Sequence, residues 1–284
     1  MSYTIYTATG CTRCKIVKQF MRERSIDYVE QDMKAAGKEA FQKFYIANRK
    51  SIFRGPAGVE FPILTDGSTI RQGIGASIAF LRANHQLDGF FSVGILHKEW
   101  VDGIHISSGN PEYAVEFLEV LRYLKGNNMK LQLDTNGLNS QLLQQILDEG
   151  LADVVIMNVV GPRELYSGIL GQDVDITEVE KTISLVSRFP EYKFQTMVVP
   201  VIRQEGDQPE VRYLTAQEIG ETAKFIQEVT GSMKNPYYIK LWQPKEASDP
   251  RVKTMEPMTP AGLLSYRNPA RVHQVFAEIE KAST

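Results

Sequence analysis

The two cysteines of this 284-residue chain constrain its fold more than any other feature. Cys11 and Cys14 lie between an apolar run, residues 3–6, and a helical pattern that begins at Ile16. When a Cys-x-x-Cys pair stands where a strand turns into a helix, the first sulfur lies over the helix N-terminus. Unpaired N–H groups and the positive end of the helix dipole stabilise a thiolate there. The pattern predicts a nucleophile, Cys11, and a resolving partner, Cys14, one turn inside the helix.

Two other interpretations of the pair are open at this stage. The cysteines could be unrelated buried thiols, or they could be half of a zinc site. A structural zinc site takes four ligands, but the chain has no further cysteine and its four histidines are scattered. We therefore expect no metal site, and we follow the redox interpretation because a β-α-β pattern surrounds the pair.

Length and charge limit what else the chain contains. A redox unit of about 100 residues leaves most of the chain for a second domain. The net charge of -2 gives no general attraction to nucleic acid or to acidic membranes, so neither is expected as a partner. The first strand begins almost at Met1, which leaves no room for a signal segment. Because both cysteines form one redox pair, we expect a cycling disulfide and a cytoplasmic location.

Residues 1–86 read as one small α/β domain. Strands are expected at residues 3–6, 28–31, 61–65 and 69–71, with helices after Cys14, around Phe41, and after Gly73. Asp66-Gly67 predicts a hairpin turn between the last two strands. Pro62 stands at the head of its strand, a position that tolerates a missing N–H donor.

The order β-α-β-α-β-β-α, the Cys11-x-x-Cys14 pair, Pro62 and the glycine turn at 73–75 resemble the glutaredoxins and the glutaredoxin-like thiol donors of ribonucleotide reductase. The resemblance implies a thioredoxin fold, a cis-proline at Pro62 beside the dithiol, and a Phe61 amide that pairs with a bound thiol peptide. An edge-strand proline is the alternative for Pro62. The substrate-binding residues that the resemblance implies are Thr12, Arg13, Phe61, Pro62 and Gly73.

Two departures from that family bear on specificity. Many glutaredoxins have Pro-Tyr between the cysteines, where this chain has Thr12-Arg13. Glu60 would repel the carboxylates of glutathione, so glutathione is a candidate ligand and not an established one. The positive charges of Arg13 and Lys15 should favour a thiolate at Cys11.

Residues 87–284 alternate between strand and helix patterns. Strands are expected at residues 91–96, 103–107, 130–134, 153–158, 194–199 and 237–242, and capping boxes are expected at Thr177 with Glu180 and at Thr215 with Glu218. Residues 244–269 hold five prolines and are expected to form an extended arm before a helix around residues 272–279. Repeated strand-helix units with short connections predict a parallel sheet, open or curled into a barrel.

Polar residues follow several of these strands, and ligands of such folds bind at the carboxyl ends of the strands. The candidate rim pocket comprises Ser107, Ser108, Gly109, Asn110, Asp134, Thr135, Asn136 and Asn158, with Arg203 and Gln243 at further strand ends. Each segment taken singly is also a common turn sequence.

Residues 90–245 resemble the radical S-adenosylmethionine activating enzymes, because 107–111 echo their Ser-Gly-Gly-Glu-Pro and 134–137 repeat their Asp-Thr-Asn-Gly. The resemblance implies a partial (βα)6 TIM-like barrel. In that family a loop with three cysteines holds a four-iron cluster, whereas this chain has no cysteine after Cys14 and has Asn110 in place of the family's Glu. Iron–sulfur clusters need thiolate ligands. We therefore expect no iron–sulfur cluster and argue against S-adenosylmethionine as a cofactor.

Three functions are consistent with the sequence. The first is a two-domain thiol-disulfide oxidoreductase whose barrel positions its substrate, a disulfide-containing protein or a small thiol. The second is a redox-sensing module whose barrel binds a nucleotide or S-adenosylmethionine without catalysis. The third is residual radical chemistry with a cluster held at Cys11 and Cys14.

Overall fold

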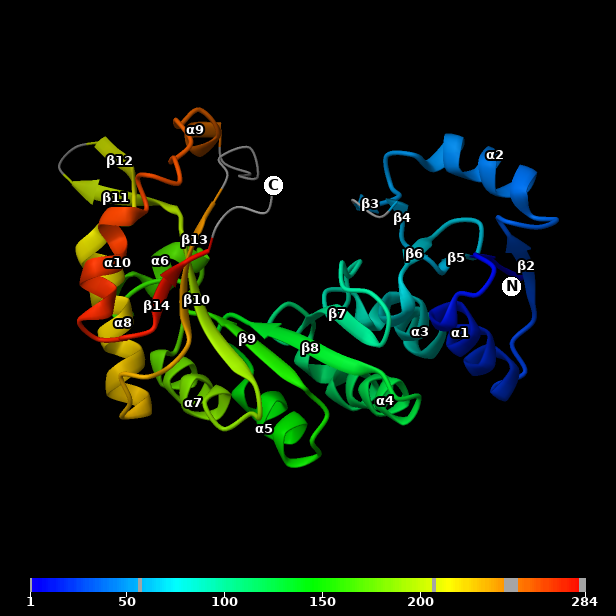
Figure 1. The fold of residues 1–284 in the computed structure, drawn as a ribbon, viewed down its shortest axis with the longest axis horizontal. Helices are drawn as coiled ribbons and strands as arrows, with labels where there is room; N and C mark the ends of the chain where they lie inside the picture. Colours follow the sequence, from blue (N-terminus) through cyan, green and yellow to red (C-terminus); the bar gives the residue numbers. More distant parts are fainter. Residues whose placement is uncertain (1, 56–57, 206–207, 243–249, 281–284) are drawn as a thin grey trace. The chain divides into compact units, whose positions relative to one another are not determined.

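The structure is a computed structural model that describes residues 2–55, 58–205, 208–242 and 250–280 (Figure 1). The chain divides into two compact units, and each is described by itself. Unit 1 comprises Met1–Leu133 and Asp148–Asp153, and unit 2 comprises Asp134–Leu147 and Val154–Thr284. No helix among the described residues is long and apolar enough to cross a bilayer.

Unit 1 begins with a four-stranded sheet in the order β2-β1-β5-β6. Its strands are β1 (Tyr3–Thr7), β2 (Tyr28–Asp32), β5 (Ile63–Thr65) and β6 (Ile70–Gln72). β1 runs parallel to β2 and antiparallel to β5, and β5 runs antiparallel to β6. This confirms the strands and the hairpin expected from the sequence. The helices are α1 (Thr12–Glu23), α2 (Lys38–Asn48) and α3 (Ile74–Ala83), and a short hairpin pairs β3 (Arg54–Gly55) with β4 (Gly58–Val59).

Alternation along β1 explains how the sheet is covered, because successive side chains of a strand point to opposite faces. Tyr6 packs with Phe41 of α2, Ile52 and Ile63 in one cluster. Its neighbour Ile5 is fully buried and must face the other side. α1 and α3 contact each other, and both carry buried apolar side chains. The N-terminus of α1 is thereby fixed at the end of β1.

Unit 1 continues into β7 (Trp100–His105), α4 (Ala114–Gly126) and two 3-10 turns, η1 (Asn84–Leu87) and η2 (Pro111–Tyr113). The expected strand at 91–96 is wrong, because only an isolated bridge joins Phe91 to Ile104. Asp102 accepts hydrogen bonds from the backbone N–H groups of Ile95 at 3.1 Å and Leu96 at 3.0 Å, so these donors need no strand partner. The strand expected at 103–107 begins three residues earlier, at Trp100.

Unit 2 is built on β9 (Val154–Asn158), β10 (Tyr192–Val198), β13 (Tyr237–Leu241) and β14 (Ala277–Ile279). Neighbouring strands among these four are parallel. The complete sheet has the order β14-β13-β10-β9-β8-β7, with β8 at Lys130–Thr135. The helices are α5 (Ser140–Asp148), α6 (Tyr166–Leu170) after the 3-10 turn η3 (Arg163–Leu165), α7 (Ile176–Val186) and α8 (Ala216–Thr230). The expected alternation of strands and helices is present.

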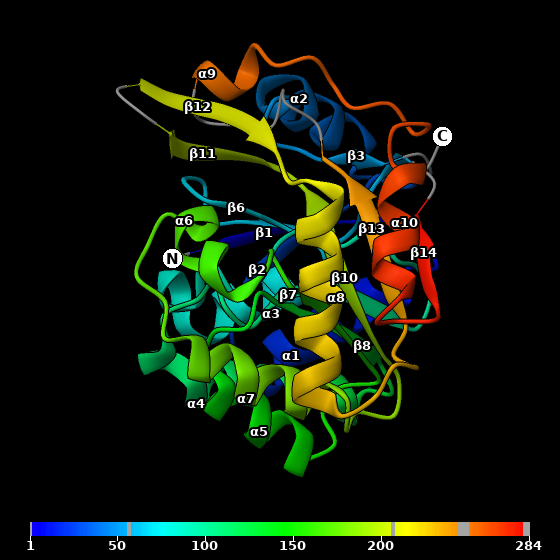
Figure 2. The same cartoon turned by 90° about the vertical axis from the view of Figure 1, so that its left-hand side faces the viewer.

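The C-terminal segment differs from the expected extended arm and final helix. It contains α9 (Pro250–Lys253) and α10 (Leu264–Arg271), and residues 277–279 form β14 (Figure 1). α10 packs along α8, as Figure 2 shows, and Arg271 Nε donates to the carbonyl of Ala277 at 3.0 Å. Packing on α8 therefore overrides the proline-rich local signal. Val272 and Phe276 are exposed and do not form the buried helical stripe that the pattern suggested.

Two more local expectations had different outcomes. Thr215 and Glu218 form the expected capping box of α8. The box expected at Thr177 is wrong, because Asp175 caps α7 by accepting the backbone N–H of Thr177. An antiparallel hairpin of β11 (Pro200–Glu205) and β12 (Gln208–Tyr213) was not predicted.

Candidate dithiol site

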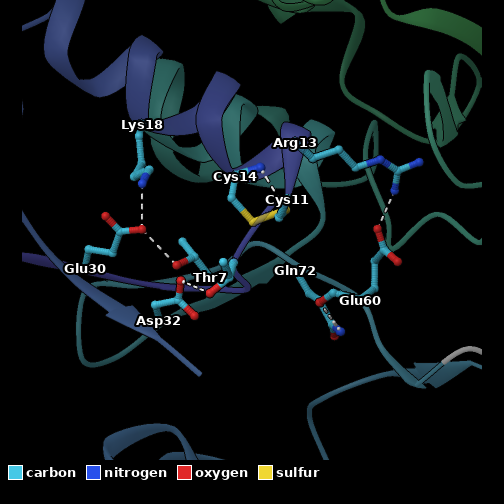
Figure 3. Close-up of a disulfide and its surroundings, with 10 residues drawn as sticks. Thr7, Cys11, Arg13, Cys14, Lys18, Glu30, Asp32, Glu60 and Gln72 are labelled. Carbon is cyan, nitrogen blue, oxygen red and sulfur yellow. Dashed lines mark hydrogen bonds and ion pairs between the residues drawn. A yellow bond between two sulfur atoms is a disulfide. The ribbon is translucent and has the colours of Figure 1, made fainter. Parts of the chain in front are cut away.

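Cys11 and Cys14 form a disulfide at the start of α1 (Figure 3). Cys11 is the N-cap residue with an extended backbone, and its sulfur accepts the backbone N–H of Cys14 at 3.1 Å. The first sulfur thus lies at the helix N-terminus, as the sequence predicted. Cys11 is partly exposed, whereas Cys14 is only 2% exposed. A substrate in solvent therefore has access to Cys11 and not to Cys14.

The charges near the pair come from α1 and β2. The first turn of α1 contains no acidic residue. On β2, Glu30 accepts hydrogen bonds from the Thr7 hydroxyl at 2.8 Å and from Lys18 Nζ at 2.6 Å (Figure 3). Hydrogen bonds from the Lys34 backbone and the Thr9 hydroxyl hold the pKa of Asp32 below its ordinary value. Both carboxylates are thus anchored by nearby donors, and Lys18 offsets the charge of Glu30.

Arg13, between the two cysteines, is only 8% exposed and points away from the disulfide toward Glu60 (Figure 3). Its Nη1 pairs with Glu60, and its Nη2 donates to the carbonyls of Leu96, at 2.5 Å, and Trp100. The sequence suggested that Arg13 would favour the thiolate and that Glu60 would repel glutathione. Because the two charges neutralise each other, each effect is reduced.

Three other residues of the predicted thiol site lie at the start of β5 and the end of β6: Phe61, Pro62 and Gly73. The Phe61–Pro62 bond is cis, which confirms that expectation. The backbone N–H of Gly73 donates to the carbonyl of Pro62 at 2.8 Å, which joins these two residues directly. Gly73 has φ +88°, a conformation that glycine adopts at little cost. Thr12 is exposed beside the cysteines.

Sequence reasoning missed Gln72, which ties the loop containing Glu60 to β6. Its side chain is 4% exposed and exchanges two hydrogen bonds with the backbone of Phe53, at 2.8 and 2.9 Å. It also donates to the carbonyl of Glu60 at 3.0 Å. A glutamine at a strand end carries no distinctive signal, because its partners lie 12 and 19 residues away. Gln72 fixes the backbone from which Glu60 reaches Arg13.

Of the candidate rim-pocket residues that lie in unit 1, Gly109 and Asn110 have local structural roles. A Cβ atom on Gly109 would lie 2.1 Å from the ring of Phe90, so only glycine fits. Asn110 Oδ1 accepts the backbone N–H of Glu112 at 3.1 Å and caps the turn η2. Ser107 is partly exposed, and Ser108 is exposed.

The rim residues of unit 2 form a second group. Thr135 Oγ1 accepts the backbone N–H of Gly137 at 3.1 Å, and the Tyr166 hydroxyl donates to the carbonyl of Asn136 at 2.9 Å. Asn158 Oδ1 accepts Gln195 Nε2 at 2.5 Å. Asp134 is partly exposed. Because the eight residues are divided between the two units, the rim pocket as a whole stays a prediction.

The candidates Arg203 and Gln243 were expected at further strand ends, but Arg203 lies within β11. Arg203 pairs with Glu218 at the start of α8 at 2.7 Å. Gln243 lies outside the described residues.

The sequence also did not predict a group of interacting polar side chains, which comprises Gln195, Lys240 and Glu280. Lys240 Nζ donates to Gln195 Oε1 at 3.2 Å and pairs with Glu280. Burial and the charge of Lys193 lower the pKa of Lys240. Gln195 and Lys240 become neighbours because β10 and β13 pair in parallel, and Glu280 joins them because it follows β14, which pairs with β13.

Metal-ligating side chains do not gather in the parts of the chain that the structure describes, where no group of three His, Cys, Asp or Glu residues could hold an ion.

No family model matches the chain, but known proteins are similar to parts of it. A protein of Methanocaldococcus jannaschii described as "Putative glycyl-radical enzyme activating enzyme" is 24% identical over 162 residues, 55% of this chain. The match spans 61% of that relative's length. The solved structure of the glutaredoxin-like protein NrdH-redoxin from Escherichia coli is 26% identical and has a TM-score of 0.21. It covers 26% of this chain and 84% of that chain. The likeness to the activating enzyme agrees with the resemblance that residues 107–111 and 134–137 indicated.

Proposed function

We propose that this protein is a thiol-disulfide oxidoreductase in which Cys11 attacks and Cys14 resolves. The observation that carries the proposal is the asymmetry of the pair. Cys11 is partly exposed and its sulfur accepts a backbone N–H at the start of α1, whereas Cys14 is buried one turn inside. A helix N-terminus stabilises a thiolate at the first position, and the thiolate is the reactive form of cysteine.

The reaction follows ordinary thiol-disulfide exchange. The Cys11 thiolate attacks one sulfur of a substrate disulfide, the substrate S–S bond breaks, and one substrate thiolate leaves. Cys14 then loses its proton and attacks the Cys11 sulfur, which releases the second substrate thiolate and forms the Cys11–Cys14 disulfide. Two electrons pass from the protein to the substrate, and an external thiol or dithiol restores the reduced pair.

The remaining features of the proposal concern the substrate and the second half of the chain. We take the substrate to be a disulfide-containing protein or a small thiol in its oxidised form. We take the strand-helix units of residues 87–284 to be a partial barrel that holds the substrate or a partner at its rim. A dithiol that cycles needs a reducing supply, which favours the cytoplasm as its location.

Reduction of insulin disulfides, with a limiting concentration of dithiothreitol as reductant, tests the proposal. The parent chain is expected to accelerate insulin precipitation, and Cys11→Ser should lower the catalysed rate by more than about tenfold because Cys14, the other thiol of the chain, is buried. Gln19→Ala is the control, since it changes an exposed residue of the same helix outside the predicted site and should keep the rate. An equal rate in the parent and Cys11→Ser would refute the proposal.

A further inference from the structure

We infer that Arg13 is a positioning residue that makes residues 92–102 part of the dithiol site. The inference deepens the proposed function and rests on it for its catalytic meaning. It extends the site beyond the first 86 residues, to a segment for which the sequence predicted only a strand. All of these residues belong to unit 1.

The guanidinium of Arg13 makes contacts in two directions. One nitrogen pairs with Glu60, whose side chain is 13% exposed, and the other donates to the carbonyls of Leu96 and Trp100. Hydrogen bonds that involve a charged group are about twice as strong as neutral ones. The residue between the two cysteines therefore holds two carbonyls of the segment.

Asp102, at the end of the segment, holds the rest of it in place through hydrogen bonds. This carboxylate accepts the N–H groups of Ile95 and Leu96, and the backbone N–H of Ser92 donates to the carbonyl of Gly103 at 2.8 Å. A Cβ atom on Gly94 would lie 2.3 Å from Asp102 Oδ1, so the backbone approaches the carboxylate closely. The Leu96 carbonyl is thus aimed at Arg13 by a fixed turn.

Little empty space remains between Arg13 and residues 92–102. The hollow bounded by Arg13, Glu60, Gly73, Gly94 and Asp102 measures only ≈ 10 Å³, too little for a substrate group. The segment therefore acts as a wall of the site, and a substrate must reach Cys11 from the exposed side.

Arginine is required for this arrangement because its planar fork has donors on two nitrogens that point in different directions. A lysine at the same position would keep a positive charge near Glu60 but would not reach Glu60 and both carbonyls together. Charge and geometry can therefore be separated by substitution.

Hydrogen exchange of the full chain, in its oxidised form, tests the geometric part. In Arg13→Met the amides of Ile95, Leu96 and Trp100 should exchange about tenfold faster, as expected when hydrogen bonds from a charged group are lost. Arg13→Lys should accelerate exchange to a similar extent. Lys15→Met removes an exposed positive charge from the same helix turn and should leave these amides unchanged. Unchanged exchange across β1, which lies in the same unit, shows that unit 1 of each variant is folded.

The rate of iodoacetamide alkylation of reduced Cys11 at pH 7 tests the charge part. Arg13→Met removes the positive charge next to Cys11 in the chain and leaves Glu60 with only the weaker contact to His97 Nδ1, at 3.7 Å, so alkylation should slow by about threefold, whereas Arg13→Lys should stay near the parent rate. Parent-like exchange in Arg13→Met or Arg13→Lys, or equal acceleration in Lys15→Met, would overturn the inference. Neither readout depends on insulin reduction, so failure of the proposed function is detected separately.

Discussion

Gly109 occupies a position where no side chain has room. A Cβ atom there would lie 2.1 Å from the ring of Phe90, and Phe90 is itself fully buried and stacked on Phe117 with ring centroids 4.4 Å apart. The ring cannot move without disturbing the core of unit 1. A glycine that the sequence placed in a ligand pocket therefore has a packing role.

Gly109→Ala is expected to lower the free energy of unfolding by about 1–3 kcal/mol, the usual cost of overpacking a core. The control is Gly126→Ala at the end of α4, where nothing lies within 4 Å of the added Cβ. Alanine favours helix by up to about 1 kcal/mol over glycine, so the control should be neutral or stabilising. Urea unfolding of the three proteins gives both values. Equal stability of Gly109→Ala and the parent would show that the Phe90 ring moves aside without cost, and it would contradict the packing role of Gly109.

Features that belong to short motifs were predictable from the sequence. The disulfide between Cys11 and Cys14 and the cis peptide bond before Pro62 were both expected, and the structure contains both. Gln72 and Asp102 were missed because each acts on backbone groups that only the tertiary fold brings near. Their residue types are common on surfaces, and burial is what gives them a role.

At the scale of elements, α8 begins with a complete capping box. The Thr215 hydroxyl accepts the backbone N–H of Glu218, and the Glu218 carboxylate accepts the backbone N–H of Thr215 at 2.7 Å and a hydrogen bond from Arg203. Burial raises the pKa of Glu218, but the hydrogen bonds from Arg203 and Thr215 outweigh it and hold the pKa below its ordinary value. The charged form of Glu218 is therefore favoured by folding.

This shift predicts how α8 responds to acid. A carboxyl whose pKa is lower in the folded chain stabilises the fold above its unfolded pKa, about 4.3, and that stability is lost as the pH falls through the folded value. Glu218→Gln should cost about 1–2 kcal/mol at pH 7, and the difference from the parent should shrink below about pH 4. Glu221→Gln, an exposed position of the same helix, is the control. A difference that stays constant with pH would contradict this account.

Elements with local signals were predicted better than those that depend on distant packing. The Thr215 box and the strands of the first sheet follow from short patterns, and both are present. The residues of β14 were predicted as helix. Their strand conformation depends on pairing with β13, forty positions earlier in the chain, and a local pattern does not show that pairing. The hairpin of β11 and β12 was missed although the sequence between its strands, Gly206-Asp207, is typical of a hairpin turn, because neither flanking segment was expected to be a strand.

At the scale of the whole chain, the predicted boundary at residue 86 lies within a compact unit. Leu87 and Phe90 are buried, and the ring of Phe20 on α1 meets Tyr123 on α4 edge-on at 4.8 Å between ring centroids. The segment His85–Gly89 is largely polar, which is typical of a linker. Leu87 within it and Phe90 just after it are buried, and they anchor the segment in the core. The boundary itself remains a prediction, and the contacts of Arg13 show how closely the dithiol is joined to residues 92–102.

Trapping of a mixed disulfide tests the central claim most directly. Reduced Cys14→Ser and reduced Cys11→Ser would each be mixed with oxidised glutathione and with insulin, and the adducts would be located by mass spectrometry of the peptides. We predict a stable adduct on Cys11 in Cys14→Ser with at least one of these disulfides, because the attacking thiol is exposed and its resolving partner is absent. We predict little or no adduct on the buried Cys14 in Cys11→Ser. Equal modification of the two cysteines, or none in either variant, would contradict the account.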